Sequence, residues 1–284
     1  MKITFIGGGN MATAIIGGMV KRGFAADEIH VVDPDAARRE YLSKEYDIGT
    51  GAPGEALPKS DAIVFAVKPQ QLRAVAEAVK ASVGNALVIT IAAGIHVGAL
   101  SAWLDGHSRI IRVMPNTPAL AQAGMSGVFA GQGTTEADRE LAERMLAAIG
   151  EFVWVEDDAD MDGITAISGS GPAYVFYFME ALQAAARAQG FSPEAARKLA
   201  YQTFAGSVKL ALESSDDIAT LRQKVTSKGG TTERAINAFE NCQLRATIIA
   251  AAAAAAARSK ELGEEFGSHH DPLKAKHADT DSGA

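Results

Sequence analysis

The chain has almost no cysteine and no long apolar run. Cys242 is the single cysteine among 284 residues, which excludes an intramolecular disulfide framework and favours a reducing compartment. No window of about 18 apolar residues is free of charged or amide side chains, so we predict no membrane span. The apolar start at residues 3–6 is too short for a signal-peptide core, and no small-residue cleavage site follows it. We therefore expect a cytoplasmic protein.

Positive charge is also scarce. Lysine and arginine total 27 against 34 aspartate and glutamate residues, which gives a net charge of −7 at pH 7. This balance argues against a protein whose main partner is a nucleic acid or an anionic membrane surface, although a local anion site is compatible with it. His269, His270 and His277 lie near the C-terminus without a second group of ligands, so we expect no metal site.

The sequence does have enough apolar residues for two folded domains. Hydrophobic residues make up 48% and charged residues 21%, an ordinary globular mixture, and at roughly 150 residues per domain the length suggests two. In the first half, apolar runs alternate with helical patterns, which predicts an α/β fold with a doubly wound parallel sheet of the Rossmann type. The predicted strands are residues 3–6, 29–32, 62–67, 87–91, 110–114, 128–130 and 152–155, and the predicted helices are residues 11–22, 36–44, 71–82 and 137–149.

The pattern changes after Glu156, where strand signals end. Helices are predicted at residues 173–189, 193–213, 217–225, 231–240 and 244–265. We therefore expect a Rossmann domain over residues 1–158, an all-helical domain over 159–266, and a disordered tail over 267–284. Residues 244–258 are rich in alanine, which allows helices to approach closely. This helix fits packing against a second subunit or an ordinary place within the domain.

A glycine-rich turn follows the first predicted strand. Gly7 and Gly9 match the first two glycines of the dinucleotide fingerprint, one for the tight turn and one for close approach to a pyrophosphate. Ala12 or Ala14 would take the third small position, and the start of the helix would offer amides to phosphate. The alternative is a tight turn that binds nothing. The position between a strand and an amphipathic helix favours the dinucleotide site.

An acid ends the second predicted strand. Asp33 lies at the distance from the glycines at which such an acid binds a ribose 2′-hydroxyl and repels a 2′-phosphate, which favours NADH. Arg38 and Arg39 follow and are alternatives that would serve a 2′-phosphate. Asp33 is also a plausible cap for the next helix.

Three loops follow the carboxyl ends of predicted strands, where ligands bind in open α/β sheets. They read Ala66-Val67-Lys68-Pro69, Ala92-Ala93-Gly94 and Met114-Pro115-Asn116-Thr117-Pro118. The helical half adds two segments before helices, Ser168-Gly169-Ser170-Gly171-Pro172-Ala173-Tyr174 and Thr226-Ser227-Lys228-Gly229-Gly230-Thr231-Thr232. Amides and hydroxyls in such segments can hold a carboxylate, although both segments also fit ordinary helix starts.

In order and content, these motifs resemble those of the pyrroline-5-carboxylate reductases over about residues 1–265. The resemblance implies reduction of 1-pyrroline-5-carboxylate to L-proline by NADPH or NADH, the last step of proline biosynthesis. It also implies an all-helical C-terminal domain that binds substrate and interlocks with its twin in a homodimer, and larger rings of dimers are typical of the family.

The resemblance also implies roles for individual residues. The glycine loop would hold the pyrophosphate, the strand-end loops would line the nicotinamide side, and the loop before the helix at 231–240 would hold substrate, with the Thr232 hydroxyl near the ring nitrogen as the catalytic group. The cofactor residues are Gly7, Gly9, Asn10, Met11, Ala12, Asp33, Ala66, Val67, Lys68, Pro69, Ala92 and Asn116; the substrate residues are Ser227, Gly229, Gly230, Thr231 and Thr232. Two departures stand out: Lys228, where many members have proline, and Asp33, which leaves the choice between NADPH and NADH open.

Two other functions fit the same two-domain plan. A 3-hydroxyacid-type dehydrogenase would need a catalytic lysine in the helical half, and Lys198, Lys209, Lys224 and Lys228 all lack that context. A non-catalytic dinucleotide sensor would bind cofactor without turnover. The number and order of the motifs favour the reductase.

Overall fold

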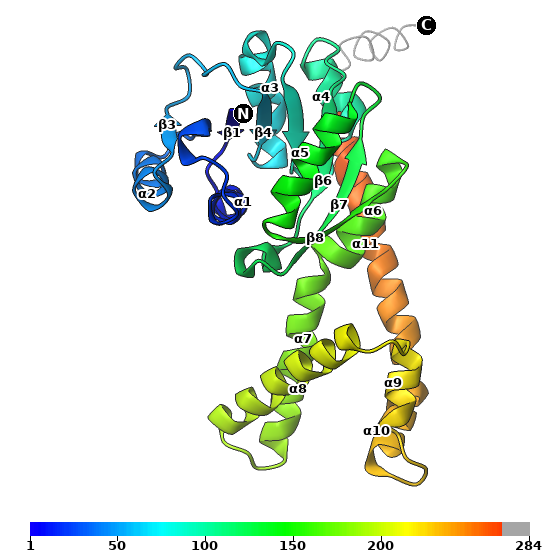
Figure 1. Ribbon diagram of the computed structural model, residues 1–284. Helices are drawn as coiled ribbons and strands as arrows, with labels where there is room; N and C mark the ends of the chain where they lie inside the picture. The colour runs from blue at the N-terminus through cyan, green and yellow to red at the C-terminus, as the bar shows by residue number, and fades with distance from the viewer. Residues whose placement is uncertain (269–284) are drawn as a thin grey trace, which may run out of the picture. The chain divides into compact units, whose positions relative to one another are not determined.

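The computed structural model describes residues 1–268, which form two compact units (Figure 1). Of the described residues, Met1–Gly169 and those from Ala255 to Ser268 form unit 1, and Ser170–Ala254 form unit 2. The division differs from the expected domain limits at 158 and 266. The last turns of helix α11 (Leu244–Ser268) contact the α/β unit, so the chain begins and ends its described part in unit 1. Of the predicted tail, residues 267 and 268 are the last residues of α11, so the prediction of disorder is wrong for these two; the rest, from His269 on, lies outside the described residues.

Unit 1 is built on an eight-stranded sheet in the order β3-β2-β1-β4-β5-β6-β7-β8. Strands β1 to β6 pair parallel with one another, whereas β7 pairs antiparallel with β6 and parallel with β8. The strands are β1 (Ile3–Ile6), β2 (Ile29–Val32), β3 (Gly49–Gly51), β4 (Ala62–Phe65), β5 (Leu87–Thr90), β6 (Ile110–Met114), β7 (Gly124–Ala130) and β8 (Gly150–Trp154).

Helices cover the sheet on both faces. The helical elements of unit 1 are α1 (Asn10–Lys21), η1 (Ala26–Glu28), α2 (Ala36–Tyr46), α3 (Pro69–Val83), α4 (Val97–Trp103), η2 (Thr117–Ala121), α5 (Glu136–Ala147), η3 (Asp158–Asp160), α6 (Met161–Ile164) and η4 (Thr165–Gly169). One core contains side chains of α1, α2 and α5, and the other contains side chains of α3 and α4. Successive strand residues alternate between the two cores, as Val64 and Phe65 do, because side chains of a strand point to opposite faces. This arrangement is the predicted doubly wound sheet.

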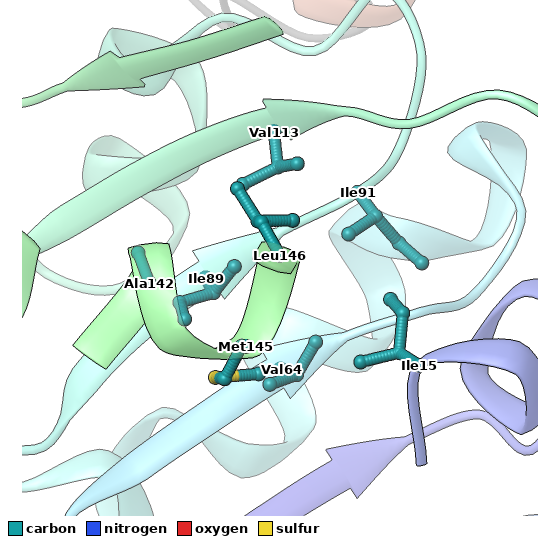
Figure 2. A pocket seen from close by; sticks show the side chains of 8 residues that line it. All are labelled: Ile15, Val64, Ile89, Ile91, Val113, Ala142, Met145 and Leu146. Carbon is teal, nitrogen blue, oxygen red and sulfur yellow. The ribbon is translucent and has the colours of Figure 1, made fainter. Parts of the chain in front are cut away.

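The first core is closely packed. A void of about 10 Å³ lies among eight apolar side chains, which come from β4, β5, β6, α1 and α5 and from Ile91 just after β5 (Figure 2). Because the void is apolar and no larger than one water molecule, it is a packing gap in the core and offers no ligand site.

The end of α11 is fixed to unit 1 by close contacts. A Cβ placed on Gly263 would lie 3.0 Å from the Gly94 carbonyl oxygen and 3.0 Å from Nε2 of His96. Ser259 is buried and donates a hydrogen bond to Asp162 at 2.6 Å. Gly94 has a φ of 75°, a conformation that suits glycine. Small residues at this contact let the helix approach the loop after β5.

Unit 2 is entirely helical in its described residues, as predicted. It contains α7 (Gly171–Ala188), α8 (Pro193–Glu213), α9 (Ile218–Lys224), α10 (Thr231–Asn241) and the first part of α11. Helix α7 packs on α8, and Ser192 caps α8 by accepting from Ala195 N at 3.2 Å. Within residues 170–254, the buried apolar side chains are those of Ala196 and Ala200. Most apolar faces of these helices therefore remain exposed in the single chain.

In the described part of the chain, every helix is too short or too polar to cross a membrane.

Candidate functional site

A cavity of unit 1 lies at the carboxyl ends of β1, β2 and β4. It has a volume of about 800 Å³ and is lined by the glycine loop, the segments after β2, β3 and β4, and one face of α3. Predicted cofactor residues on its wall are Gly7, Gly9, Asp33, Ala66, Val67 and Lys68. The order of the strands changes direction between β1 and β4, and ligands of open α/β sheets bind at such a point.

The glycine loop has the geometry of a phosphate-binding turn. Gly7 has a φ of 101°, and a Cβ placed on it would lie 2.8 Å from the Ala66 carbonyl oxygen, so the loop presses against the end of β4. Gly9 begins α1 as its N-cap, without a side-chain cap, and a Cβ placed on it would meet nothing within 4 Å. The first-turn amides of α1 have no acceptor within the helix and can donate to an anion. The residues therefore fit a dinucleotide pyrophosphate.

The next three predicted residues lie in the first turn of α1. Asn10 is exposed, Met11 packs against the core, and Ala12 is 1% exposed inside it. The side chains of Met11 and Ala12 therefore serve the core, which leaves their backbone amides for any contact with cofactor.

Asp33 holds the glycine loop in place. Its Oδ2 accepts a hydrogen bond from Gly8 N at 2.7 Å, and its Oδ1 accepts one from Asp35 N at 2.8 Å. The alternative role as a helix cap falls to Asp35, which accepts from Ala37 N and Arg38 N. Each carboxylate oxygen of Asp33 keeps a second lone pair, so the side chain can also accept from a ribose hydroxyl.

Of the loops on the expected nicotinamide side, one lines the cavity and the others support neighbouring elements. Lys68 is the N-cap of α3 and Pro69 is its first residue. Ala92 is buried in the second core. Asn116 is nearly buried; its Oδ1 accepts from Met125 N at 2.9 Å, and its Nδ2 donates to the Ser168 carbonyl at 3.1 Å. Asn116 thus joins the loop after β6 to β7 and to η4, a supporting role that its sequence motif did not indicate.

The predicted substrate loop lies in unit 2, before α10. Gly229 has a φ of 74°, and its amide donates to Glu233 Oε2 at 2.7 Å. The amide of Gly230 donates to the Ser227 carbonyl at 3.0 Å. Thr231 is exposed and Thr232 is half-buried, in a first turn without a side-chain cap. The amides that this loop leaves available for an anion are therefore those of the first turn of α10, because those of Gly229 and Gly230 already have protein acceptors.

Two features of these sites were missing from the sequence interpretation. Gly8 matters through its amide and because a Cβ there would lie 2.7 Å from Leu42 Cδ1. The segment after β3, which includes Glu55, forms one wall of the cavity. This segment has no periodic sequence pattern; it includes Pro53, Gly54 and Glu55. Its position at the sheet edge follows from strand β3, which the sequence interpretation did not predict.

Comparisons with known proteins match both halves of the chain. A family model described as pyrroline-5-carboxylate reductase dimerisation matches residues 158–262, and one described as NADP oxidoreductase, coenzyme F420-dependent, matches residues 2–94. The pyrroline-5-carboxylate reductase of Pseudomonas aeruginosa is 41% identical over 268 residues, which cover 94% of this chain and 98% of that protein.

Two solved structures are similar over both units. One is a pyrroline-5-carboxylate reductase from Coxiella burnetii, with a TM-score of 0.86 and 39% identity, covering 92% of this chain and 98% of that one. The other is a Plasmodium falciparum pyrroline carboxylate reductase with NADP bound, with a TM-score of 0.82 and 29% identity, covering 93% of this chain and 98% of that one.

The doubly wound sheet, the open glycine turn and the cavity at the strand ends are those of a dinucleotide-binding domain, and the family matches identify it as part of an oxidoreductase that uses NAD(P). At 41% identity over nearly the whole length of a curated relative, the chain belongs to the pyrroline-5-carboxylate reductase family.

Proposed function

We propose that the chain reduces the C=N bond of 1-pyrroline-5-carboxylate to give L-proline, with NAD(P)H as the reductant. The observation that carries this proposal is the full-length relationship to the Pseudomonas aeruginosa reductase. The glycine turn and the loop before α10, which each keep the residues expected for cofactor and substrate, support it. The relatives do not favour the hydroxyacid dehydrogenase or the non-catalytic sensor.

The cofactor, when bound, supplies the hydride. The protein has to hold and orient both reactants. Free amides at the start of α1 suit the pyrophosphate, and those at the start of α10, including Thr231 and Thr232, suit the substrate carboxylate. The Thr232 hydroxyl would hydrogen-bond the ring nitrogen, which has to be protonated as the hydride arrives at the adjacent carbon.

A spectrophotometric assay tests the function. Purified protein is mixed with 1-pyrroline-5-carboxylate and either NADH or NADPH, and the loss of absorbance of the reduced cofactor is followed together with the formation of proline. A chain that binds the dinucleotide but forms no proline would contradict the proposal and favour the sensor. Oxidation of hydroxyacids in place of imine reduction would favour the dehydrogenase.

Thr232→Ala is expected to lower kcat/KM by about 10- to 100-fold, on the scale of one hydrogen bond that is made to the reacting group. Thr232→Ser keeps a hydroxyl and should restore most of the activity. Thr232 is only half-buried, in the first turn of α10, so neither substitution should impair folding. Circular dichroism of both variants checks this. Wild-type kcat/KM in the alanine variant would refute the role.

A homodimer through unit 2 forms part of the proposal. The match to a dimerisation family model supports it, as does the exposure of large apolar side chains on five helices: Phe176, Tyr177, Leu210, Leu212, Ile218, Phe239 and Ile249. Soluble monomers rarely leave so much apolar surface uncovered. The further expectations are a cytoplasmic enzyme whose partners are its small substrate and other copies of itself, up to rings of dimers.

The mass in solution tests the dimer. Light scattering on a sizing column should give at least twice the chain mass of 29.6 kDa. The double variant Leu212→Glu and Phe239→Glu should shift the protein towards the monomer, because it places charges on exposed apolar positions of α8 and α10. A monomeric wild-type protein at micromolar concentration would contradict this part of the proposal, and a larger multiple of the dimer mass would support rings.

A further inference from the structure

The charged lining of the cofactor cavity is uneven. Within the described residues, the charged side chains on its wall are Asp33, Glu55 and Lys68. Lys68 follows β4, on the side of the cavity next to α3. The two acids belong to the segments after β2 and β3, which is the side where the ribose 2′ position lies in dinucleotide-binding folds.

Asp33 and Glu55 flank the same point of the sheet. Gly51, the last residue of β3, pairs with Val32, and its carbonyl accepts from Asp33 N at 3.2 Å. A Cβ placed on Gly51 would lie 2.9 Å from Oε2 of Glu55, so the Glu55 carboxylate lies over the end of β3. Both acids are therefore next to the β2–β3 edge of the cavity.

The nearby cations do little to offset these two charges. Arg39, an alternative partner for a 2′-phosphate, donates from its Nη1 to the carbonyl oxygens of Asp33 at 2.6 Å and Pro34 at 3.1 Å, which holds it on the backbone of that loop. His30 lies beside Glu55, but burial lowers its pKa despite the raising effect of Glu55, so its ring is mostly neutral near pH 7. Arg38 passes Gly8 with its aliphatic stem and does not line the cavity.

We propose that Glu55, together with Asp33, makes this chain prefer NADH by repelling the 2′-phosphate of NADPH, with Glu55 as the residue that sets the ratio. A 2′-phosphate carries nearly two negative charges at neutral pH, and like charges a few ångströms apart at a protein surface repel strongly enough to change an affinity about tenfold. The proposal rests on the proposed function only for the identity of the cofactor.

The test measures binding without substrate. Full-length wild-type protein, Glu55→Gln and Glu55→Lys are titrated with NADH and NADPH, and competition with adenosine 2′,5′-bisphosphate and adenosine 5′-monophosphate isolates the 2′-phosphate. Glu45→Gln is the matched control, because Glu45 is an exposed acid on α2 outside the cavity wall. Glu55 is itself exposed in a loop, so its replacement should leave the fold intact.

Wild-type protein should bind NADH more tightly than NADPH. The Kd for NADPH divided by the Kd for NADH should fall about tenfold in Glu55→Gln and further in Glu55→Lys. High salt should reduce the difference between the two Kd values of the wild type. Two results would overturn the proposal: tighter binding of NADPH than of NADH by the wild type, or the same ratio of Kd values in Glu55→Gln as in the control Glu45→Gln. Selective NADH binding without imine reduction would refute the proposed reaction and leave this inference standing.

Discussion

Replacement of Gly9 by valine is expected to weaken the binding of both NADH and NADPH at least ~100-fold, because a side chain there takes the place of the closely approaching pyrophosphate. The protein itself has room for the change. A Cβ on Gly9 meets nothing within 4 Å, and its backbone, with φ of −63° and ψ of −178°, suits any residue. The stability should fall by no more than about 1 kcal/mol, the cost of a poorer N-cap.

The neighbouring glycines provide the contrast. Gly7→Val should lose folding as well as binding, because Gly7 has a positive φ and a Cβ there would lie 2.8 Å from the Ala66 carbonyl oxygen. Gly98 in α4 also has nothing within 4 Å of a Cβ but lies away from the cavity, so Gly98→Val should bind like the wild type. Calorimetric titration and a thermal melt of each variant separate the two effects. Wild-type affinity in Gly9→Val would mean that the pyrophosphate does not approach this turn.

Continuous apolar runs and helix caps were enough to predict most of the fold. The limits of β1, β2, β6 and α8 agree with the sequence prediction, since each is a clear run between turn signals or begins at a capped proline. Strand β3 was missed because Gly49-Thr50-Gly51 has no apolar residue, and its place is set by pairing with β2. The early part of β7 was missed because Gly124, Ser126 and Gly127 hide its pattern. Such strands owe their conformation to neighbours that are distant in the sequence.

The same distinction applies to the site. Gly7 and Gly9 could be read from the sequence because the turn imposes a local demand on its backbone. The hydrogen bond from Gly8 to Asp33 spans 25 residues and those from Asn116 to Ser168 span 52, so no local motif reveals them. Glu55 lies at the cavity because strand β3, which precedes it, pairs with β2. Sequence motifs thus named the groups that would contact a ligand, whereas the supporting contacts depend on tertiary structure.

Arg112 is a buried residue that the sequence interpretation did not single out, because it is the one charged residue of the otherwise apolar strand β6. It is 1% exposed and pairs with Asp158 Oδ1 at 2.6 Å; its Nη1 also lies 3.2 Å from the Asp158 carbonyl oxygen and 3.3 Å from Nδ1 of His96. The other carboxylate oxygen of Asp158 accepts from Val97 N at 2.8 Å, at the start of α4. This cluster links strand β6 to the segment after β8 and to α4, which follows the loop at residues 92–94.

Arg112→Met is expected to lower the free energy of unfolding of unit 1 by about 3–5 kcal/mol, because it leaves Asp158 partly buried without its partner. The chain's two tryptophans, Trp103 and Trp154, lie in unit 1, so their fluorescence during urea unfolding reports on this unit. Lys80→Met, which breaks an exposed pair with Asp105 at 3.0 Å, should cost less than about 1 kcal/mol.

The double variant Arg112→Met and Asp158→Leu distinguishes the loss of attraction from the cost of an isolated buried charge. Replacing both members of a buried pair by apolar residues is often close to neutral, so the double variant should recover most of the loss. Two groups then limit the recovery: Val97 N loses its acceptor, and His96 loses both of its partners in the cluster. If Arg112→Met cost no more than Lys80→Met, the pair would add nothing to stability. If the double variant were as unstable as the single one, the contribution of Asp158 would come from its bond to α4 and not from its charge pair with Arg112.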